Sequence, residues 1–334
     1  MKRVLITGIA GQDGSYLAEL LLAKGYEVFG LVQPKSNIQY VPQGVDISSG
    51  DLADPLCLQT LVARATPDEV YNLAGITYLK TAYDEPELTM KINYESVGVL
   101  LNECIKVNPQ VRFLQASSSE VFLPSPTPLT EESPRDWETK NPYAKAKMMA
   151  DRDFIQAARD TKNTFACSAI LFNHESPRCP NSRVLKKITR SLVAITRGQE
   201  DCLSIGNVAL RRDWGSAPDY VYAMWSMLQM DIPTDLVLAT GETHSVQDAI
   251  TIAAELLELK LVWQGEGVDT YAYDASGEKI VMTTTEFYKP IEPHPKVGDA
   301  SKAERIIGWK AKTSFSTLIR SMLDAASDLG SQRG

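Results

Sequence analysis

The chain has 334 residues, of which 44% are hydrophobic and 23% charged, and its formal net charge is −8. This length suffices for one large α/β domain and a smaller one. The acidic balance argues against non-specific binding of nucleic acid or of an anionic membrane, so positive side chains are expected to serve local anion sites.

The N-terminus and the cysteines indicate a cytoplasmic protein. Met1-Lys2-Arg3 runs directly into an apolar strand, which excludes a signal peptide, and no apolar stretch is long enough to span a bilayer. The five cysteines are odd in number and never closely paired, which fits neither a disulfide scaffold nor a zinc site. With only three histidines in the chain, no metal centre is expected.

The first fifty residues predict a strand, a glycine turn, a helix and a second strand. Residues 2–7 form a buried parallel strand, residues 15–24 a helix and residues 26–32 the next strand. Gly8, Gly11 and Gly14 have the spacing that lets backbone N–H groups and a helix N-terminus receive a pyrophosphate. The alternative is a tight turn that binds nothing, but the strand and helix around it favour a dinucleotide site.

Strands and helices continue to alternate along the chain, which predicts a Rossmann-type doubly wound parallel sheet. Further strands are expected at 69–73, 111–116 and 164–172, and helices at 55–65, 88–106 and 143–159. We expect residues 1–172 to form the dinucleotide-binding domain, with 216–242 returning to it. Residues 173–215 and 243–330 are expected to form a smaller mixed α/β domain that binds the substrate.

Two motifs that follow the predicted strand at 111–116 carry the chemistry. Ser118 and Glu120 follow a strand that ends at Ala116, where ligands of a doubly wound sheet bind; taken alone, this run also fits a turn with a helix cap. Tyr143 is the only one of the 13 tyrosines with a lysine, Lys147, four residues on. On a helix this pair shares one face, where the ammonium is expected to stabilise a phenolate base for a sugar hydroxyl.

These motifs and several longer runs together resemble the GDP-mannose 4,6-dehydratases, a family of extended short-chain dehydrogenases/reductases. The resemblance runs from residue 2 to about residue 325. The glycine turn, the Ser117–Glu120 run and the Tyr-Lys pair identify the superfamily. The dehydratase group is indicated by Asn173-His174-Glu175-Ser176-Pro177-Arg178 and Arg212-Asp213-Trp214-Gly215.

The resemblance implies a role for each of the four groups. Tyr143, assisted by Lys147, takes the O4 proton while hydride leaves C4 of GDP-mannose for the nicotinamide. A carboxylate matching Glu120 removes the C5 proton and protonates the departing C6 hydroxyl, and hydride then returns to C6. Ser118, where threonine is usual, hydrogen-bonds O4. The product is GDP-4-keto-6-deoxymannose, a precursor in deoxysugar biosynthesis.

The resemblance also implies two binding sets. The residues implied for cofactor binding are Gly8, Gly11, Gln12, Asp13, Gly14, Lys35, Asp51, Leu52, Leu73 and Ala74, with Tyr143 and Lys147. The residues implied for binding the GDP-sugar are Asn173, Lys187, Arg212, Lys289 and Glu292. Family members assemble as homodimers or homotetramers, here expected through the helices at 88–106 and 143–159.

The chain departs from the family pattern at several positions. After Val32 the usual arginine pair is missing, and the loop before Gly50 is shorter. Lys35 is left to hold a 2′-phosphate, and no acidic residue ends the second strand to hold a free ribose 2′-hydroxyl, so we expect NADP, with NAD possible. Cys179, Pro180 and Lys289 replace two arginines and a glycine, and Leu123 replaces another glycine.

The same residues are compatible with three other functions. The chain is another nucleotide-sugar 4,6-dehydratase, an epimerase or reductase on this scaffold, or a non-catalytic nucleotide-sugar binder. Epimerases normally lack a carboxylate at the position of Glu120, because they do not remove a C5 proton. A binding protein would have no physical reason to keep the whole set of Ser118, Glu120, Tyr143 and Lys147.

Overall fold

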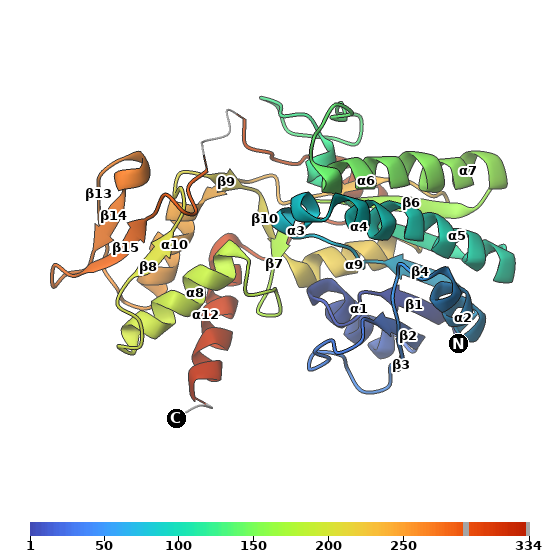
Figure 1. Cartoon of the computed structure of the whole chain (residues 1–334), viewed down its shortest axis with the longest axis horizontal. Helices are drawn as coiled ribbons and strands as arrows, with labels where there is room; N and C mark the ends of the chain where they lie inside the picture. Colours follow the sequence, from blue (N-terminus) through green and yellow to red (C-terminus); the bar gives the residue numbers. More distant parts are fainter. Residues whose placement is uncertain (290–293, 332–334) are drawn as a thin grey trace.

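The computed structural model describes residues 1–289 and 294–331, and a seven-stranded sheet forms its largest part (Figure 1). The strand order is β11-β6-β5-β4-β1-β2-β3, and every pairing is parallel. These strands are β1 (Arg3–Thr7), β2 (Glu27–Val32), β3 (Asp46–Ser49), β4 (Glu69–Asn72), β5 (Arg112–Ser118), β6 (Phe165–Leu171) and β11 (Leu236–Leu238). Since the order reverses between β1 and β4, ligands are expected beyond the carboxyl ends of these two strands.

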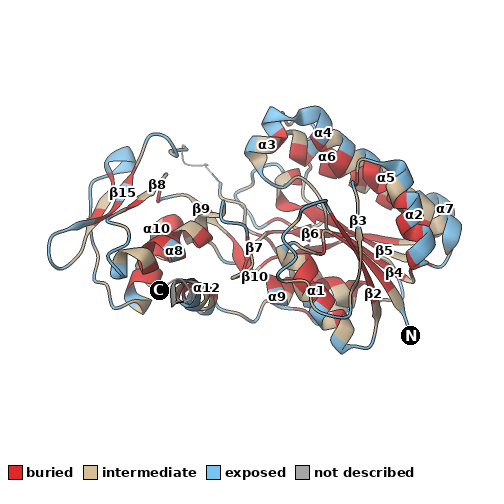
Figure 2. Cartoon of the chain, turned by 60° about the horizontal axis from the view of Figure 1, so that its bottom comes forward, coloured by how far each residue is buried: buried red, intermediate tan, exposed pale blue. Residues whose placement is uncertain are grey.

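Helices cover both faces of this sheet, so its strands are buried on both sides (Figure 2). One face packs against α1 (Gln12–Ala23), α9 (Ala217–Met227) and α11 (Ser301–Ile307). The other packs against α2 (Pro55–Ala65), α5 (Ser96–Val107) and α7 (Ala157–Lys162). The predicted doubly wound α/β fold is confirmed. Burial on both faces explains why its strands show as continuous apolar runs in the sequence.

The two predicted long helices are present but are interrupted. The first is built from α4 (Pro86–Met90), a π-helical turn at Lys91–Glu95 and α5, and is preceded by α3 (Leu79–Asp84). The second consists of α6 (Pro142–Ala150), a π-helical turn at Asp151–Gln156 and α7. A π-turn inserts a residue without breaking the helix, and such turns are frequent at functional sites.

A smaller unit lies beside the sheet (Figure 1). Its four strands run in the order β13-β14-β15-β8, with both parallel and antiparallel pairs. They are β8 (Leu203–Ile205), β13 (Val262–Gln264), β14 (Tyr271–Tyr273) and β15 (Lys279–Thr283). A separate apolar core joins them to α8 (Val184–Thr196), α10 (Val246–Leu256) and α12 (Phe315–Ser331). The connection to the large sheet includes two short pairs, β7 (Asn173–Glu175) with β10 (Trp214–Ser216) and β9 (Arg211–Arg212) with β12 (His244–Ser245).

The chain crosses between the two units more than once. β11, from the segment expected to return to the first domain, pairs with β6 in the large sheet. Ala303 and Trp309, from the range assigned to the second domain, also pack into the core of the large sheet. The domain boundaries given above therefore stay a prediction.

A buried polar row aligns the carboxyl ends of three central strands. Thr7, Asn72 and Gln115 face one another in register across β1, β4 and β5. Thr7 Oγ1 donates to Asn72 Oδ1 over 2.6 Å, and Asn72 Nδ2 donates to Gln115 Oε1 over 2.7 Å. Because buried polar groups are costly without partners, a shift in register would leave all three unsatisfied. The row thus fixes the relative positions of the strand ends at which the predicted site lies.

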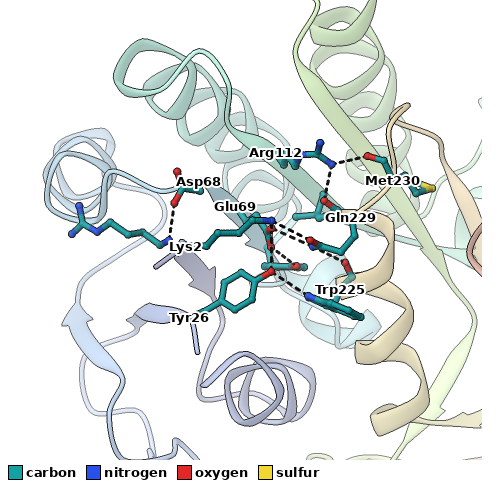
Figure 3. A network of polar contacts seen from close by, with 11 residues as sticks. Lys2, Tyr26, Asp68, Glu69, Arg112, Trp225, Gln229 and Met230 are labelled. Carbon is teal, nitrogen blue, oxygen red and sulfur yellow. Dashed lines mark hydrogen bonds and ion pairs between the residues drawn. The ribbon is translucent and has the colours of Figure 1, made fainter. Parts of the chain in front are cut away.

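At the opposite ends of these strands, a network of polar contacts surrounds the fully buried Glu69 (Figure 3). Its carboxylate accepts from Lys2 Nζ at 2.7 Å, Tyr26 OH at 3.3 Å, Tyr71 OH at 3.0 Å and Gln229 Nε2 at 3.2 Å. These contacts join β1, β2, β4 and the end of α9. They lie at the end of the strands away from the glycine turn, which indicates a role in stability.

We expect Glu69→Ala to lower the free energy of unfolding by about 2–4 kcal/mol, because each buried polar group left without a partner costs about 1–3 kcal/mol. Tyr71 is fully buried and loses its acceptor. Urea unfolding followed by circular dichroism measures the change. Glu27→Ala, which removes a half-exposed partner of Arg3 on the neighbouring strand, is the control and should change stability by less than about 0.5 kcal/mol. Equal losses in both variants would contradict the role given to the Glu69 network.

Candidate active site

A cavity of about 650 Å³ opens at the carboxyl ends of β1, β4, β5 and β6. The glycine turn forms one wall, and the start of α6 with the end of β5 forms another. Residues of β7, β9 and the segment before α8 complete it. The three motifs singled out in the sequence thus line one cavity.

The glycine turn is shaped for close backbone approach. Gly8 has a φ of +72°, and a Cβ atom there would lie 2.9 Å from the Cα of Ala74. Gly11 N donates to Gly8 O over 2.9 Å, and Gly11 caps the N-terminus of α1. The first-turn N–H groups of α1 therefore face the cavity without intervening side chains, which fits the pyrophosphate of a dinucleotide. Of the residues predicted for the cofactor, Gln12, Asp13, Leu52, Leu73 and Ala74 also line the cavity.

The part of the cavity that is expected to receive the adenosine is lined by other residues than those predicted. Lys35 is exposed, has a φ of +67° and does not line the cavity, whereas Gln33, Ser36 and Asn37 do. Asp51 is also exposed, and its carboxylate accepts from the N–H of Ala53 at 2.9 Å. The positive φ turns the backbone at Lys35, so the polar residues around it, not the lysine, meet the cavity.

The helix that carries the Tyr-Lys pair has a well-defined start. The Asn141 side chain accepts from the N–H of Tyr143 at 3.0 Å and of Ala144 at 3.4 Å, and Pro142 occupies the first helical position. Tyr143 and Lys147 therefore share one face, and both line the cavity. Across from them Ser118 ends β5, and its side chain hydrogen-bonds the Tyr143 hydroxyl. Glu120 lies two residues further on, in a short 3-10 turn.

Lys147 is only 3% exposed, and its Nζ donates to the carbonyl of Ala116 over 2.7 Å. Burial lowers its pKa to about 8, against the opposing attraction of Asp151. Asp151, which is partly buried, accepts from the hydroxyls of Ser117 and Ser168. Burial raises its pKa to about 6, although both hydrogen bonds favour the carboxylate.

The expectation that Lys147 lowers the pKa of Tyr143 is not met in this structure. Burial raises the pKa of Tyr143, and the nearby Glu120 adds to this, against the hydrogen bond from Ser118 and the charge of Arg183. Lys147 Nζ lies 5.9 Å from the centre of the tyrosine ring and is directed to Ala116 O. The cost of desolvating the phenolate therefore exceeds the help of the ammonium in the protein alone.

The residues predicted for the GDP-sugar are only partly brought together. Asn173 and Arg212 line the cavity. Lys187 Nζ lies over the ring of Phe287, 4.3 Å from its centre, and the backbone carbonyl of Lys289 accepts from Asn207 Nδ2. Neither of these lysines lines the cavity. Glu292 lies outside the described residues.

His174 of the Asn-His-Glu-Ser-Pro run links β7 to the glycine turn. Its Nε2 is 2.9 Å from Asp13 Oδ2, and its ring stacks on Tyr220 with centres 4.6 Å apart. Burial opposes both charges, but each partner favours the charged form of the other, so the pKa of His174 is raised and that of Asp13 is lowered. The role of this histidine is to hold the cavity walls together.

Three functional candidates were missed in the sequence. Asp151 follows Lys147 by four residues, a spacing that could have revealed it, because the helix places both on the face of Tyr143. Glu175 is 3% exposed, lines the cavity and has one oxygen without a hydrogen-bond partner among the described residues. Arg183, just before α8, also lines the cavity, but nothing in the local sequence distinguishes it from a surface arginine.

Comparison with known proteins agrees with this geometry. The sequence profile of the family described as GDP-mannose 4,6 dehydratase matches residues 5–322. A GDP-mannose 4,6 dehydratase of Drosophila melanogaster is 39% identical over 98% of this chain and 87% of its own length. That of Vibrio cholerae serotype O1 is 39% identical over 98% and 94%.

The chain belongs to the GDP-mannose 4,6-dehydratase family.

Solved structures with lower identity share the fold. RMD from Pseudomonas aeruginosa, complexed with NADPH, has a TM-score of 0.79 at 22% identity and covers 98% of this chain and all of its own. The UDP-glucose 4-epimerase of Thermus thermophilus, complexed with NAD, has a TM-score of 0.78 at 22% identity over 97% and 98%. The GDP-mannose 4,6-dehydratase family consists of lyases that use NADP(H), so a nicotinamide dinucleotide is the cofactor class for this chain.

Two further observations bear on the sequence expectations. In the described part of this family member no group of three histidine, cysteine or acidic side chains is placed to hold a metal ion, and no helix is long and apolar enough to cross a membrane. All five cysteines have free thiols.

We expect Asp151→Asn to move the alkaline limb of the dehydratase pH profile to lower pH by about half to one unit. Removing the anion that favours the Lys147 ammonium lowers a pKa that already lies near 8, so the lysine loses its charge at a lower pH. The rate of product formation between pH 6 and 10 measures this. Asp153→Asn, which removes a partly buried acid two residues away that is paired with Arg152, is the control, and an equal shift there would contradict a specific role for Asp151.

Proposed function

We propose that this family member converts GDP-mannose to GDP-4-keto-6-deoxymannose with loss of one water. The observation that carries the proposal is the convergence of Ser118, Glu120, Tyr143 and Lys147 on one cavity beside a dinucleotide-type glycine turn. The set contains a group for each proton that the reaction moves, and a carboxylate at the position of Glu120 favours elimination over epimerisation.

Oxidation at C4 requires a base for the O4 proton, and Tyr143 takes this role. Its hydroxyl already has Ser118 as a neighbour, which leaves the serine placed to hydrogen-bond O4 beside it. Lys147 stabilises the tyrosinate that accepts this proton. Hydride removal from C4 and its return to C6 is the chemistry that a bound nicotinamide dinucleotide supplies.

Elimination follows because the C4 ketone acidifies the C5 proton. Glu120 removes that proton and passes it to the C6 hydroxyl, which leaves as water. When hydride adds to C6, C5 needs a proton, and the one taken from O4 balances it. The reaction therefore has no net redox change, and the side chains end in their starting protonation states.

In this proposal, charged and hydrogen-bonding side chains hold the nucleotide part of the substrate. Arg212 and the N-terminal region of α8 face the cavity from the smaller unit, where a diphosphate would meet positive groups. Asn173 is placed at the join of the two units and contacts the sugar in this proposal. Lys187 and Lys289 would need to turn toward the nucleotide to take the roles that the family resemblance implies.

NADP is the proposed cofactor, and the preference over NAD is expected to be small. No acidic side chain follows β2 to select a free 2′-hydroxyl, and Ser36, Asn37 and Gln33 line the cavity at this end. Neutral hydrogen-bonding groups accept either cofactor. Lys35 does not line the cavity and would need to turn toward the 2′-phosphate to offer its one exposed charge. We also propose a cytoplasmic homodimer or homotetramer built on the helices around α5 and α6, which light scattering tests at micromolar concentration.

We expect NADP to bind about two- to fivefold more tightly than NAD, since a single exposed charge contributes about 0.5–1 kcal/mol. Titration followed by tryptophan fluorescence measures both affinities. Lys35→Ala should remove the difference, while Lys310→Ala, in a distant loop, should leave it unchanged. A preference for NAD in the unmodified protein would overturn the cofactor proposal.

We expect Tyr143→Phe and Glu120→Gln to stop the reaction at different points. Tyr143→Phe removes the acceptor of the O4 proton, so neither oxidation nor water loss should occur. Glu120→Gln should still oxidise C4, so that reduced nicotinamide accumulates, while water loss falls by about 10²- to 10⁴-fold. Absorbance of the reduced cofactor and mass spectrometry of the products measure the two steps.

The same assay tests the substrate. GDP-mannose should lose one water, and a panel of dTDP-, UDP- and CDP-sugars should not. Water loss from one of these and none from any GDP-sugar would contradict the proposed substrate. Near-normal turnover by Glu120→Gln would show that another group removes the C5 proton, and an epimerised or reduced product would indicate one of the other reactions of this scaffold.

A further inference from the structure

Glu120 is paired with a cation from a distant part of the chain. Lys296 Nζ lies 3.2 Å from Glu120 Oε2, and the lysine side chain is only 17% exposed. Glu120 lies in the 3-10 turn after β5 of the large sheet, whereas Lys296 comes after β15 of the smaller unit in sequence. No motif near either residue predicts the pair.

The segment that carries Lys296 is anchored directly after it. Val297 O accepts from Leu129 N at 2.8 Å, and Asp299 N donates to Leu129 O over 2.9 Å, which forms a bridge between Leu129 and Gly298. Gly298 N also donates to the buried Asp213 over 3.2 Å. The backbone thus fixes where the lysine side chain begins, so its contact with Glu120 is not that of a freely moving surface residue.

Other functional groups of the cavity surround the pair of Glu120 and Lys296. Tyr143 faces the carboxylate from α6, and the charge of Glu120 raises the pKa of that tyrosine. Arg183, whose charge also acts on Tyr143, lines the same cavity from the segment before α8. Ser118 binds the backbone N–H of Glu120 over 3.2 Å, which leaves the carboxylate directed away from β5 and toward Lys296.

We propose that Lys296 is a positioning residue that holds the Glu120 carboxylate in one orientation for the proton transfers of the elimination. This inference rests on the proposed function of Glu120. The ammonium and the carboxylate lie 3.2 Å apart and the lysine side chain is mostly enclosed, so the ion pair keeps the carboxylate from rotating while the substrate is oxidised.

The same charge helps the second transfer. The C5–H bond breaks, its proton goes to Glu120 and its electron pair passes into the C4 ketone as an enolate. The enolate then forms the C5–C6 double bond as the C6–O bond breaks, and Glu120 gives its proton to the departing oxygen, which leaves as water. After the first transfer Lys296 faces a neutral acid, which favours release of the proton, and Lys296 itself gains and loses none.

The kinetic test compares Lys296→Met, which removes the charge and keeps the length, with Lys296→Arg, which restores a cation. Lys310→Met, at an exposed position, is the matched control. In Lys296→Met we expect about a tenfold loss in the rate of water elimination, because the carboxylate is no longer held in place. KM for GDP-mannose and the reduced-nicotinamide signal of C4 oxidation should change by less than about twofold.

Deuterium uptake at C5 in heavy water should fall in parallel with elimination. Lys296→Arg should recover most of the loss, and thermal melts followed by circular dichroism verify that all three variants fold. Unchanged elimination and unchanged C5 exchange in Lys296→Met would overturn the proposal. So would an equal loss of C4 oxidation, since the lysine would then serve the whole site and not Glu120.

A measurement without turnover separates this inference from the proposed function. Glutamate labelled with ¹³C at the side-chain carboxyl gives an NMR signal for Glu120, identified by its disappearance in Glu120→Gln. In Lys296→Met this signal should shift and broaden, because a carboxylate without its ammonium partner samples several orientations, even if GDP-mannose proves not to be the substrate. An identical signal in the two proteins would overturn the inference, whereas absence of product from GDP-mannose alone would overturn only the proposed function.

Discussion

A single buried ammonium determines how the site is assembled. Lys147 is almost fully enclosed, and a cation in such surroundings is tolerated only when acceptors and negative charge compensate it. The carbonyl that ends the regular part of β5 and the carboxylate one helical turn further along supply this compensation. Any arrangement of α6 that broke these contacts would leave the charge buried and unpaired. The position of Tyr143 relative to Ser118 follows from this constraint, and with it the place where a sugar hydroxyl is to bind.

Local patterns in the sequence predicted the parts of the fold that are determined locally. Apolar runs predicted β1, β2, β4, β5 and β6, and the glycine spacing predicted the turn before α1, because burial on both faces and close backbone approach each require particular residue types. The short strand β3 was missed, since its polar, half-buried residues form no apolar run. The π-turns within the two long helices and the left-handed backbone at Lys35 were missed as well. The electrostatic properties of the site were predicted least well from the sequence, because the pKa of Tyr143 and the partner of Glu120 depend on residues far apart in the chain.

The position of Arg178 shows how a departure from the family pattern is accommodated. Its guanidinium is paired with Glu19 over 2.6 Å, donates to Ser15 and lies over the ring of Tyr16. The arginine is therefore used to hold the segment after β7 against α1. Its neighbour Cys179 is buried against Glu175, where a second arginine would meet the same acid. Arg183 lies on the same side of the cavity, so the positive charge at this wall comes from a different position in the sequence.

The distribution of these groups along the chain has an evolutionary consequence. The side chains that move protons sit on two neighbouring elements, the end of β5 and the start of α6, whereas most groups facing the nucleotide come from separate, later segments. Substrate choice can therefore drift while the reaction type is inherited unchanged, because selection acts on the two parts through different stretches of the gene. The departures of this chain follow that division. They fall in the loop after β2, near Cys179, at Lys289 and at Leu123 just after the 3-10 turn, and among the proton-transfer residues only one hydroxyl, that of Ser118, has been exchanged for its near equivalent.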